Sequence, residues 1–514
     1  MSVVDKRPQK LWFILLGAGT LLYFALGAAT ASHGHEWGDD WAQYVSHAIN
    51  IATGHAYADI GYLFNADAPH VGPPSYPPGL PLLLAPIVAL FGANVFALKI
   101  ACFFFLALSV PVAYCVLATS FSRQIALAAV CLFALHDAIW GLRESIGSEA
   151  PYILFSCLAL WSATMSPPPS ARQFASFGLG IVVGFLIYGT TAIRSIGVAL
   201  VPAALIFGWT QRRQLAWFLG LALSFCALIL LQRLLLVAPT TYANELEPPT
   251  AISILTNAWD YWVALSNVFR APLHLSRLLA SVILLLSIFG ALKFSFGSER
   301  RSRGASCLRD YMAGIPLFVL YVAAYVAALL LASISPGSRY LLPILPFILG
   351  LTLYGGGALA RIVRLRETIG IIGAVAFFAA YYAGLHVTSP RLHEDELATC
   401  RQCMDMYKFV ETHTPPGAVI AFAKPRAMAL LAGRRSWAWS TEYSPSELRR
   451  RLHDIGATEI VIATPFSAIA DRYPASLQFA SLVAEPGNAV VFQNSMFRVI
   501  DLGEHEETLN LSAQ

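Results

Sequence analysis

The stretch that decides the fold is residues 95–119, VFALKIACFFFLALSVPVAYCVLAT, in which Lys99 is the one charged side chain. A helix of about 20 apolar residues crosses a bilayer, because it satisfies its backbone hydrogen bonds internally. Apolar and polar residues do not alternate here, as they would in the strands of a membrane β-barrel. The stretch therefore predicts a transmembrane helix.

Comparable apolar runs recur along most of the chain. They predict an α-helical polytopic membrane protein rather than a barrel. We expect about eleven transmembrane helices, at roughly 11–30, 95–119, 124–141, 150–165, 174–193, 195–211, 215–237, 278–295, 311–333, 340–359 and 370–389.

Composition excludes other classes of protein. The 514 residues are 57% hydrophobic and 12% charged, and the mean hydropathy is +0.61. A soluble domain carries about 25% charged residues, and a disordered chain has low hydrophobicity. The net charge of +4 is too small to indicate a nucleic-acid partner. Membrane lipids are the expected surroundings.

The distribution of basic residues predicts the orientation of the helices. Lysines and arginines collect in the N-terminal tail and in alternate connections, and cytoplasmic loops are enriched in them. We therefore expect a cytoplasmic N-terminus, with the loop at 31–94 and the tail at 390–514 outside the cytoplasm. The basic residues that carry this prediction are Lys6, Arg7, Lys10, Arg123, Arg172, Arg212, Arg213, Arg300, Arg301, Arg303, Arg309, Arg361, Arg364 and Arg366.

The chain divides at about residue 390. Residues 1–389 form the predicted transmembrane region, and 390–514 is richer in charge, with short β-rich runs that alternate with helical stretches. This alternation predicts a small α/β domain. Cys400 and Cys403 lie in this tail, and we expect a structural disulfide rather than a redox or metal site.

The first outer loop carries the candidate catalytic residues. Asp39 and Asp40 follow the first predicted span, and Asp40, Tyr44 and His47 fall on one face of a helix that begins there. A carboxylate held near the membrane interface can act as a general base. Asp39 could instead cap the helix, and the adjacent carboxylates could hold a divalent cation such as Mg²⁺ or Mn²⁺. No metal cluster is otherwise predicted.

Two further segments supply charged residues on the same side. The second outer loop holds Arg143, Glu144 and Glu149, which either pair with one another or present a second acid toward Asp40. Arg339 and Tyr340 lie at the mouth of a later span. An arginine there either anchors the helix at the interface or binds an anionic headgroup through two parallel hydrogen bonds.

The ordered set of motifs resembles the GT-C glycosyltransferases, above all the bacterial family-39-type and aminoarabinose-transferase-type enzymes, which are related to protein O-mannosyltransferases. The likeness covers nearly the whole chain at the level of architecture. The residues that carry it are Asp39, Asp40, Tyr44, Ala48, Gly54 and Tyr57, then Tyr76-Pro77-Pro78-Gly79, Ser148-Glu149-Ala150-Pro151-Tyr152 and Arg339-Tyr340-Leu341-Leu342-Pro343.

The resemblance implies an inverting transfer of a sugar from a polyprenyl-phosphate carrier to a lipid, glycan or protein acceptor. The reaction would occur on the periplasmic side of a bacterial inner membrane and would require no cofactor. Asp40 would be the base, with Asp39 beside it, and Glu149 a second functional acid. The substrate-contacting residues would be Tyr44, His47, Tyr76, Lys99, Arg143, Glu144, Arg194, Arg339 and Tyr340.

One position departs from the family pattern. Aminoarabinose enzymes usually have Lys-Pro-Pro where this chain has Tyr76-Pro77-Pro78. The phosphate-binding lysine is therefore absent, which leaves Arg339, Lys99 or Arg194 for that contact. Three alternative functions stay open: a transporter or flippase of lipid-linked sugars, a ligase or polymerase of the O-antigen type, and a non-catalytic membrane assembly protein whose exported domain does the binding.

Overall fold

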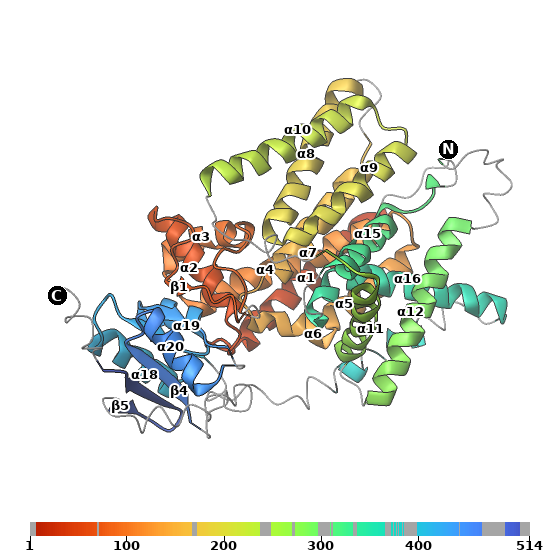
Figure 1. The fold of residues 1–514 in the computed structure, drawn as a ribbon. Coiled ribbons are helices and arrows are strands. Elements are labelled where there is room, and N and C mark those ends of the chain that lie inside the picture. Colours follow the sequence, from red (N-terminus) through yellow and green to blue (C-terminus); the bar gives the residue numbers. More distant parts are fainter. Residues whose placement is uncertain are drawn as a thin grey trace.

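The structure is a computed structural model, and Figure 1 shows its two parts. A large helical core holds most of the chain, and a smaller C-terminal domain, residues 398–503 and coloured blue, lies beside the helices of the first loop. The described residues are 7–68, 71–166, 172–236, 248–269, 273–296, 309, 312–332, 337–364, single positions between 372 and 384, 398–440, 443–464 and 489–503.

The core is built from long apolar helices joined by short connections. Those described are α1 (Arg7–Thr30), α4 (Val95–Ala118), α5 (Arg123–Leu135), α6 (Asp137–Trp140), η2 (Gly141–Glu144), α7 (Glu149–Thr164), α8 (Arg172–Ile193), η4 (Ser195–Ala199), α9 (Leu200–Thr210), α10 (Leu215–Leu235), α11 (Ala251–Val268), α12 (Leu273–Phe296), α15 (Leu317–Leu331), η6 (Ser338–Ile344) and α16 (Leu345–Ile362).

Most predicted spans coincide with these helices, with three differences. The span predicted at 124–141 is bent by 59° where α5 gives way to residues 137–144. Helix α11 was not predicted, because Asn257 and Asp260 interrupt its apolar run. The predicted span at 370–389 lies mostly outside the described residues.

Within the described residues, five helices are long and apolar enough to cross a membrane, or six if the bent pair is one span. Several other predicted spans are represented by shorter apolar helices, among them Leu317–Leu331. These helices and their composition are those of a multi-pass membrane protein. The count of eleven spans stays a prediction.

Helices α8 and α10 illustrate how the core packs. A Cβ atom at Gly180 or Gly220 would overlap the backbone of the opposite helix, at Trp217 and Phe177 respectively. Small residues let two helix backbones approach closely where lipid provides no hydrophobic driving force for association. The two helices therefore pack closely and run in the same direction, with α9 between them in the sequence.

The first loop contains two helices and a strand: α2 (Asp40–Thr53), β1 (Tyr62–Leu63) and α3 (Gly79–Phe91). Helix α2 ends at Gly54, which adopts a left-handed conformation with φ of 75°. The start of α3 lies against the end of α8, where a Cβ on Gly79 would come within 2.5 Å of the Ile193 nitrogen. This close approach holds Gly79 against the residues that directly precede Arg194.

The C-terminal domain is an α/β fold, as its sequence predicts. Its sheet has the order β1-β3-β2-β4-β6-β5. The first four strands in this order are parallel to one another, and β6 is antiparallel to both of its neighbours, β4 and β5. The remaining elements of the domain are α18 (Arg401–His413), β2 (Val419–Ala421), α19 (Pro425–Ala432), β3 (Arg435–Trp437), α20 (Pro445–Asp454), β4 (Glu459–Ala463), β5 (Ala489–Gln493) and β6 (Phe497–Asp501).

The first loop and the C-terminal domain share one structure. Strand β1 of the loop adds to the edge of the sheet by pairing with β3, Tyr62 opposite Ser436. Trp37 packs between the rings of Phe422 and Phe497, with centroids 6.4 and 5.9 Å away. The boundary near residue 390 is therefore a change in composition. It is not a boundary in packing, because the first loop and the C-terminal domain are in direct contact.

Candidate active site

Asp40 is the centre of a cluster of charged and phenolic groups. Its carboxylate accepts hydrogen bonds from the Tyr76 hydroxyl at 2.7 Å, from Arg339 Nη1 at 2.8 Å and from Arg426 Nη1 at 3.2 Å. These partners come from three separated parts of the chain: the first loop, η6 and α19. The fold thus concentrates on Asp40 groups that favour its charged form.

The two arginines on Asp40 differ in their access to solvent. The Arg339 side chain is 51% exposed, the Asp40 side chain 34% and the Arg426 side chain 1%. One face of the carboxylate is therefore held inside the protein, and the other opens outward together with Arg339.

Three residues of α2 meet the same tyrosine. Asp40 accepts from the Tyr76 hydroxyl, the Tyr44 ring lies 5.1 Å from the Tyr76 ring, and His47 Nε2 accepts from the Tyr76 backbone N–H at 3.3 Å. This confirms that Asp40, Tyr44 and His47 share one face of a helix. Tyr57 donates to the Tyr76 carbonyl at 2.7 Å and further fixes the turn.

Electrostatics keep Asp40 ionised and His47 neutral. Burial alone would raise the pKa of Asp40, but the charges of Arg339 and Arg426 and the Tyr76 hydrogen bond outweigh it and hold that pKa at about 2. Burial lowers the pKa of His47 to about 4. His47 Nδ1 lies 2.7 Å from the Tyr57 carbonyl and must donate to it, which leaves Nε2 as the acceptor.

Asp39 has a different role from the one its sequence position suggests. Helix α2 begins at Asp40, as predicted, but the Asp39 carboxylate gives α2, all of whose residues are described, no capping bond. It accepts instead from two backbone N–H groups of α19, those of Arg426 at 3.3 Å and Ala427 at 3.0 Å. Burial raises the pKa of Asp39, while the charges of Arg426 and Lys424 oppose that change.

Arg426 is the residue that the sequence did not reveal. It lies between the rings of Tyr62 and Tyr76, 5.1 and 4.8 Å from their centroids, and donates to the Tyr76 hydroxyl at 2.9 Å. It is also 386 residues away from Asp40 in the chain. Its local sequence, PRAMALLA, gives no signal for a site, and only the docking of α19 on α2 brings it there.

Glu149 and Arg194 form a second ion pair, with Arg194 Nη1 2.6 Å from Glu149 Oε1. Both side chains are about nine-tenths buried, at 9% and 10% exposure. The Tyr340 ring connects this pair with Asp40, because the guanidinium carbons of Arg194 and Arg339 lie 5.1 and 5.4 Å from its centroid. The two acids expected on one side therefore belong to one continuous cluster.

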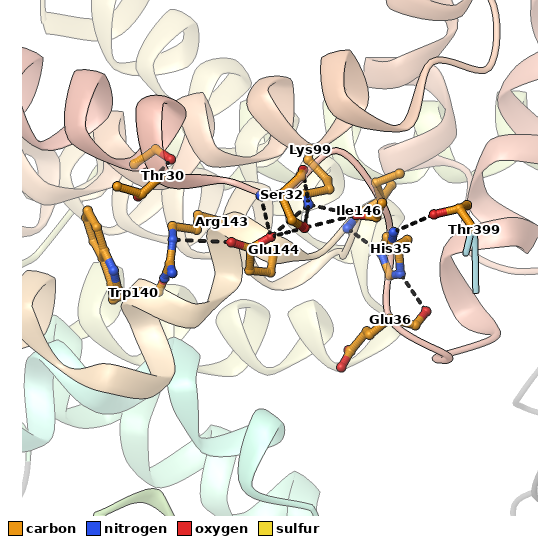
Figure 2. A network of polar contacts seen from close by, with 12 residues as sticks. Thr30, Ser32, His35, Glu36, Lys99, Trp140, Arg143, Glu144, Ile146 and Thr399 are labelled. Carbon is orange, nitrogen blue, oxygen red and sulfur yellow. Dashed lines mark hydrogen bonds and ion pairs between the residues drawn. The ribbon is translucent and has the colours of Figure 1, made fainter. Parts of the chain in front are cut away.

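Lys99 and Glu144 make a separate polar network, shown in Figure 2. Lys99 Nζ donates to Glu144 Oε2 at 2.8 Å and to the backbone carbonyls of Ser32 and Gly34 at 2.7 and 2.9 Å. Arg143 Nε lies 3.4 Å from Glu144 Oε1, so one of the two pairings expected for Arg143 is present. The network joins α4 and η2 to the beginning of the first loop.

His35 links that network to the C-terminal domain. Its Nε2 accepts from the Ile146 N–H at 3.0 Å, and its carbonyl accepts from the Ala398 N–H at 2.8 Å (Figure 2 shows the ring contacts). A second contact runs from the His35 N–H to Thr399 Oγ1 at 3.3 Å. The loop between the first span and α2 is thereby fixed on both sides.

Asp39 and Asp40 fit a shared divalent cation poorly. Their carboxylates point to different partners, the α19 backbone and the two arginines. Among the described residues there is also no group of three or more His, Cys, Asp or Glu side chains suited to a metal. We therefore derive no chemical step through a cation.

The cysteines and two tryptophans of the tail are structural. Cys400 and Cys403 form a disulfide, with Cα atoms 5.0 Å apart, at the start of α18. Trp437 and Trp439 are buried in the core of the C-terminal domain rather than presented to a ligand.

Comparison with solved structures identifies the fold. ArnT from Cupriavidus metallidurans bound to undecaprenyl phosphate aligns with a TM-score of 0.54 at 12% identity, over 96% of this chain and 98% of that chain. The apo oligosaccharyltransferase of Archaeoglobus fulgidus aligns with a TM-score of 0.54 at 12% identity, over 91% of this chain and 71% of that one. This chain has the GT-C glycosyltransferase fold.

A third structure with this GT-C fold is the arabinofuranosyltransferase AftD from mycobacteria, with a TM-score of 0.51 at 14% identity. It covers 98% of this chain, which spans 42% of AftD. No protein-family model and no curated protein matches the sequence. The GT-C likeness therefore rests on the arrangement of elements, which confirms the resemblance drawn from the ordered motifs.

Proposed function

We propose that this chain is an inverting glycosyltransferase that moves a sugar from a polyprenyl-phosphate donor to an acceptor on the periplasmic side of the inner membrane. The observation that carries the proposal is an ionised carboxylate, Asp40, with one buried face and one face open beside Arg339. The fold supports it, because two structures with the same fold are described with undecaprenyl phosphate and with dolichol-phosphate.

The reaction requires a base and a group that stabilises the leaving phosphate. The acceptor hydroxyl would attack the anomeric carbon from the face opposite the phosphate, and its proton would pass to Asp40. The bond between the anomeric carbon and the phosphate oxygen would break, and the electron pair would leave on the polyprenyl phosphate. Attack from the opposite face inverts the configuration at that carbon.

Arg339 is the proposed contact for the phosphate. Its guanidinium is half-exposed, and a guanidinium binds phosphate through two parallel hydrogen bonds. Binding of the carrier would draw Arg339 away from Asp40 and raise the pKa of that carboxylate, which makes it a better base. Arg194, across the Tyr340 ring, would add positive charge to the same region.

The remaining predicted site residues divide into two groups. Tyr340, beside Arg339 at the open face of Asp40, is the proposed contact for the donor and its sugar. We propose support roles for the others. Tyr76 binds the buried Oδ1 of Asp40 together with Arg426, and Tyr44 packs on the Tyr76 ring. The rest are His47, whose ring is fully bonded, Glu149, and the network of Lys99, Arg143 and Glu144. The acceptor remains a lipid, a glycan or a protein.

A transfer assay with the Asp40→Asn variant tests the proposal. The full-length protein in nanodiscs is first analysed by mass spectrometry for co-purifying polyprenyl phosphate and the sugar attached to it. The variant should bind this donor and fail to transfer the sugar. Asp59→Asn, in the same loop, is the matched control and should transfer normally. Normal turnover by Asp40→Asn would overturn the assignment of the base.

The same assay separates the alternatives. A flippase would move the lipid between leaflets without forming a glycosylated product. A ligase or polymerase of the O-antigen type would release a polyprenyl diphosphate, whereas the proposed reaction releases a polyprenyl monophosphate. The mass of the released carrier distinguishes the two transferases.

A further inference from the structure

Two consecutive acids of the first loop bind the same helix of the C-terminal domain in two different ways. Asp39 accepts from the backbone of α19, and Asp40 accepts from the Arg426 side chain of α19. Helix α19 lies directly against α2 in Figure 1. The domain that the tail forms is therefore in contact with the proposed base, and not only with its surroundings.

We infer that the C-terminal domain completes the active site: Asp39 docks α19, and the docked Arg426 holds Asp40 and Tyr76 in their working orientation. Asp39 and Arg426 are then positioning residues, because they act through Asp40 rather than on the substrate. This inference rests on the proposed function of Asp40. It gives the two adjacent aspartates separate roles.

The N-terminus of helix α19 needs a cap from outside the helix. The first N–H groups of a helix have no partner within the helix, and an acceptor must be supplied. The residue at the N-cap of this eight-residue helix is Lys424, whose side chain has no acceptor atom. Asp39 supplies the acceptor from the first loop, to both Arg426 N–H and Ala427 N–H. A negative charge is also favourable at this end of a helix.

The side chain of Arg426 is held in one fixed geometry. Its guanidinium donates to Asp40, to the Tyr76 hydroxyl and, at 3.4 Å, to the Pro73 carbonyl. The rings of Tyr62 and Tyr76 lie on it, and Tyr62 belongs to β1, which itself pairs with the C-terminal sheet. Such a planar fork, buried on all sides, sets the direction of the groups that it bonds.

Arg426 and Arg339 bind Asp40 in contrasting ways. Both arginines bond to the Asp40 carboxylate, through different oxygens, Oδ2 for Arg339 and Oδ1 for Arg426. The exposed Arg339 can exchange Asp40 for a phosphate, while the buried Arg426 cannot leave. Asp40 thus retains one cationic partner throughout the reaction, and that partner belongs to the C-terminal domain.

Arg426 contributes both a positive charge and a fixed geometry, and two substitutions separate these contributions. Arg426→Met removes both, so kcat should fall roughly 100-fold, as for a small misplacement of a catalytic group. Arg426→Lys keeps the charge and loses the fork, so kcat should fall less. The donor KM should change little in both variants, because Arg426 contacts Asp40 and Tyr76 rather than the proposed donor face.

A merely structural role of Arg426 would leave the pH profile of kcat/KM unchanged, so this profile tests the positioning role. Asp40 faces Arg339 from η6, Arg426 from α19, Tyr76 from the loop turn and the neighbouring Asp39. Loss of one opposite charge raises the pKa of a carboxyl by roughly 1–3 units. The acid limb should therefore move to higher pH in Arg426→Met and stay in place in Arg426→Lys.

Hydrogen exchange tests the docking without any activity assay. In Asp39→Asn, the amides of Arg426 and Ala427 should lose protection from exchange. The two carboxylate oxygens of Asp39 each accept one of these N–H groups, and the neutral Asn side chain has a single acceptor oxygen. Arg451→Met is the matched control: it breaks another ion pair between the C-terminal domain and the first loop, Arg451 to Asp67 at 2.7 Å. That control should leave both amides, kcat and the acid limb unchanged.

The outcomes separate this inference from the proposed function. Arg426→Met with the wild-type kcat and acid limb, alongside an inactive Asp40→Asn, would overturn the inference and leave the function standing. Unchanged protection of both amides in Asp39→Asn would also overturn it. If Asp40→Asn transferred sugar normally, the assignment of Asp40 as the base would fail, and the role of Arg426 as a positioning residue would fail with it.

Discussion

The ammonium nitrogen of Lys99 lies 2.8 Å from Glu144 Oε2, and the Lys99 side chain has no exposed surface. This pair lies at the junction of α4, η2 and the first loop, and Glu144 is partly buried (Figure 2). Lys99 Nζ bonds to Glu144 and to the backbone carbonyls of Ser32 and Gly34, so we assign the pair a structural role. It is one of the cations that the sequence offered as a phosphate contact.

Lys99→Met should therefore lower the thermal stability of the protein more than its affinity for polyprenyl phosphate. Removal of Lys99 takes a charge-assisted hydrogen bond from the partly buried Glu144, which keeps Arg143 at 3.4 Å, and such a bond contributes about 1.5–3 kcal/mol. Thermal unfolding in detergent measures the loss. The double variant Lys99→Met with Glu144→Gln should recover part of it, because it also removes the remaining charge. A stable single variant that no longer binds polyprenyl phosphate would show that Lys99 contacts the donor.

Glu149 and Arg194 should be energetically coupled. Replacement of Glu149 by Gln or of Arg194 by Met breaks a buried pair at 2.6 Å and leaves one charge alone. The double variant should be less defective than the sum of the two single variants, by at least roughly 1 kcal/mol in unfolding free energy or in the barrier to transfer. Additive effects would mean that the two side chains act separately.

Stability should fall as the pH drops from about 6.5 to about 4. Burial lowers the pKa of both His35 and His47 to about 4, so over this range the unfolded chain binds protons that the folded chain does not. The melting temperature at fixed ionic strength measures the loss. His47→Gln should flatten part of the slope, and His55→Gln, an exposed histidine in the same loop, should not. A flat profile for the wild type would contradict the prediction.

Removal of divalent cations should leave sugar transfer unchanged. The oxygens of Asp39 and Asp40 bond to α19 and to two arginines, and a cation between them would have to displace these partners. Transfer by protein dialysed against EDTA, compared with and without added Mg²⁺ or Mn²⁺, measures this. Loss of activity on chelation, restored by the metal, would establish a cation site and revise the roles of both aspartates.

Much of the architecture was predictable from local sequence. Residues 95–119 correspond to α4 nearly end to end, because a long apolar run in lipid has few alternatives to a helix. Helix α2 begins at Asp40, and three polar residues of its predicted face, Asp40, Tyr44 and His47, all meet Tyr76. Helical periodicity is a local property, and it therefore survives in the folded chain.

The sequence could not predict which partners these residues would find. Asp39 is placed to cap α2, yet it caps α19, and β1 of the first loop joins a sheet formed by the tail. Both contacts bridge more than 370 residues of chain, as in the pairing of Asp39 with Ala427, 388 positions apart. No periodicity or spacing in a single sequence reports a contact of that range.

The sequence by itself determined that this is a helical membrane protein, and it predicted that most acids and a few arginines lie on one side, because the cost of placing charge in lipid restricts where charged residues occur. It also determined that Asp40 lies on a polar helix face. Only the tertiary structure decided that Arg339 and Arg426 hold the two oxygens of that carboxylate, one exposed and one buried. The physical reason is that ion pairs form between whichever charges the packing of distant helices brings within about 4 Å, and packing is a property of the whole chain.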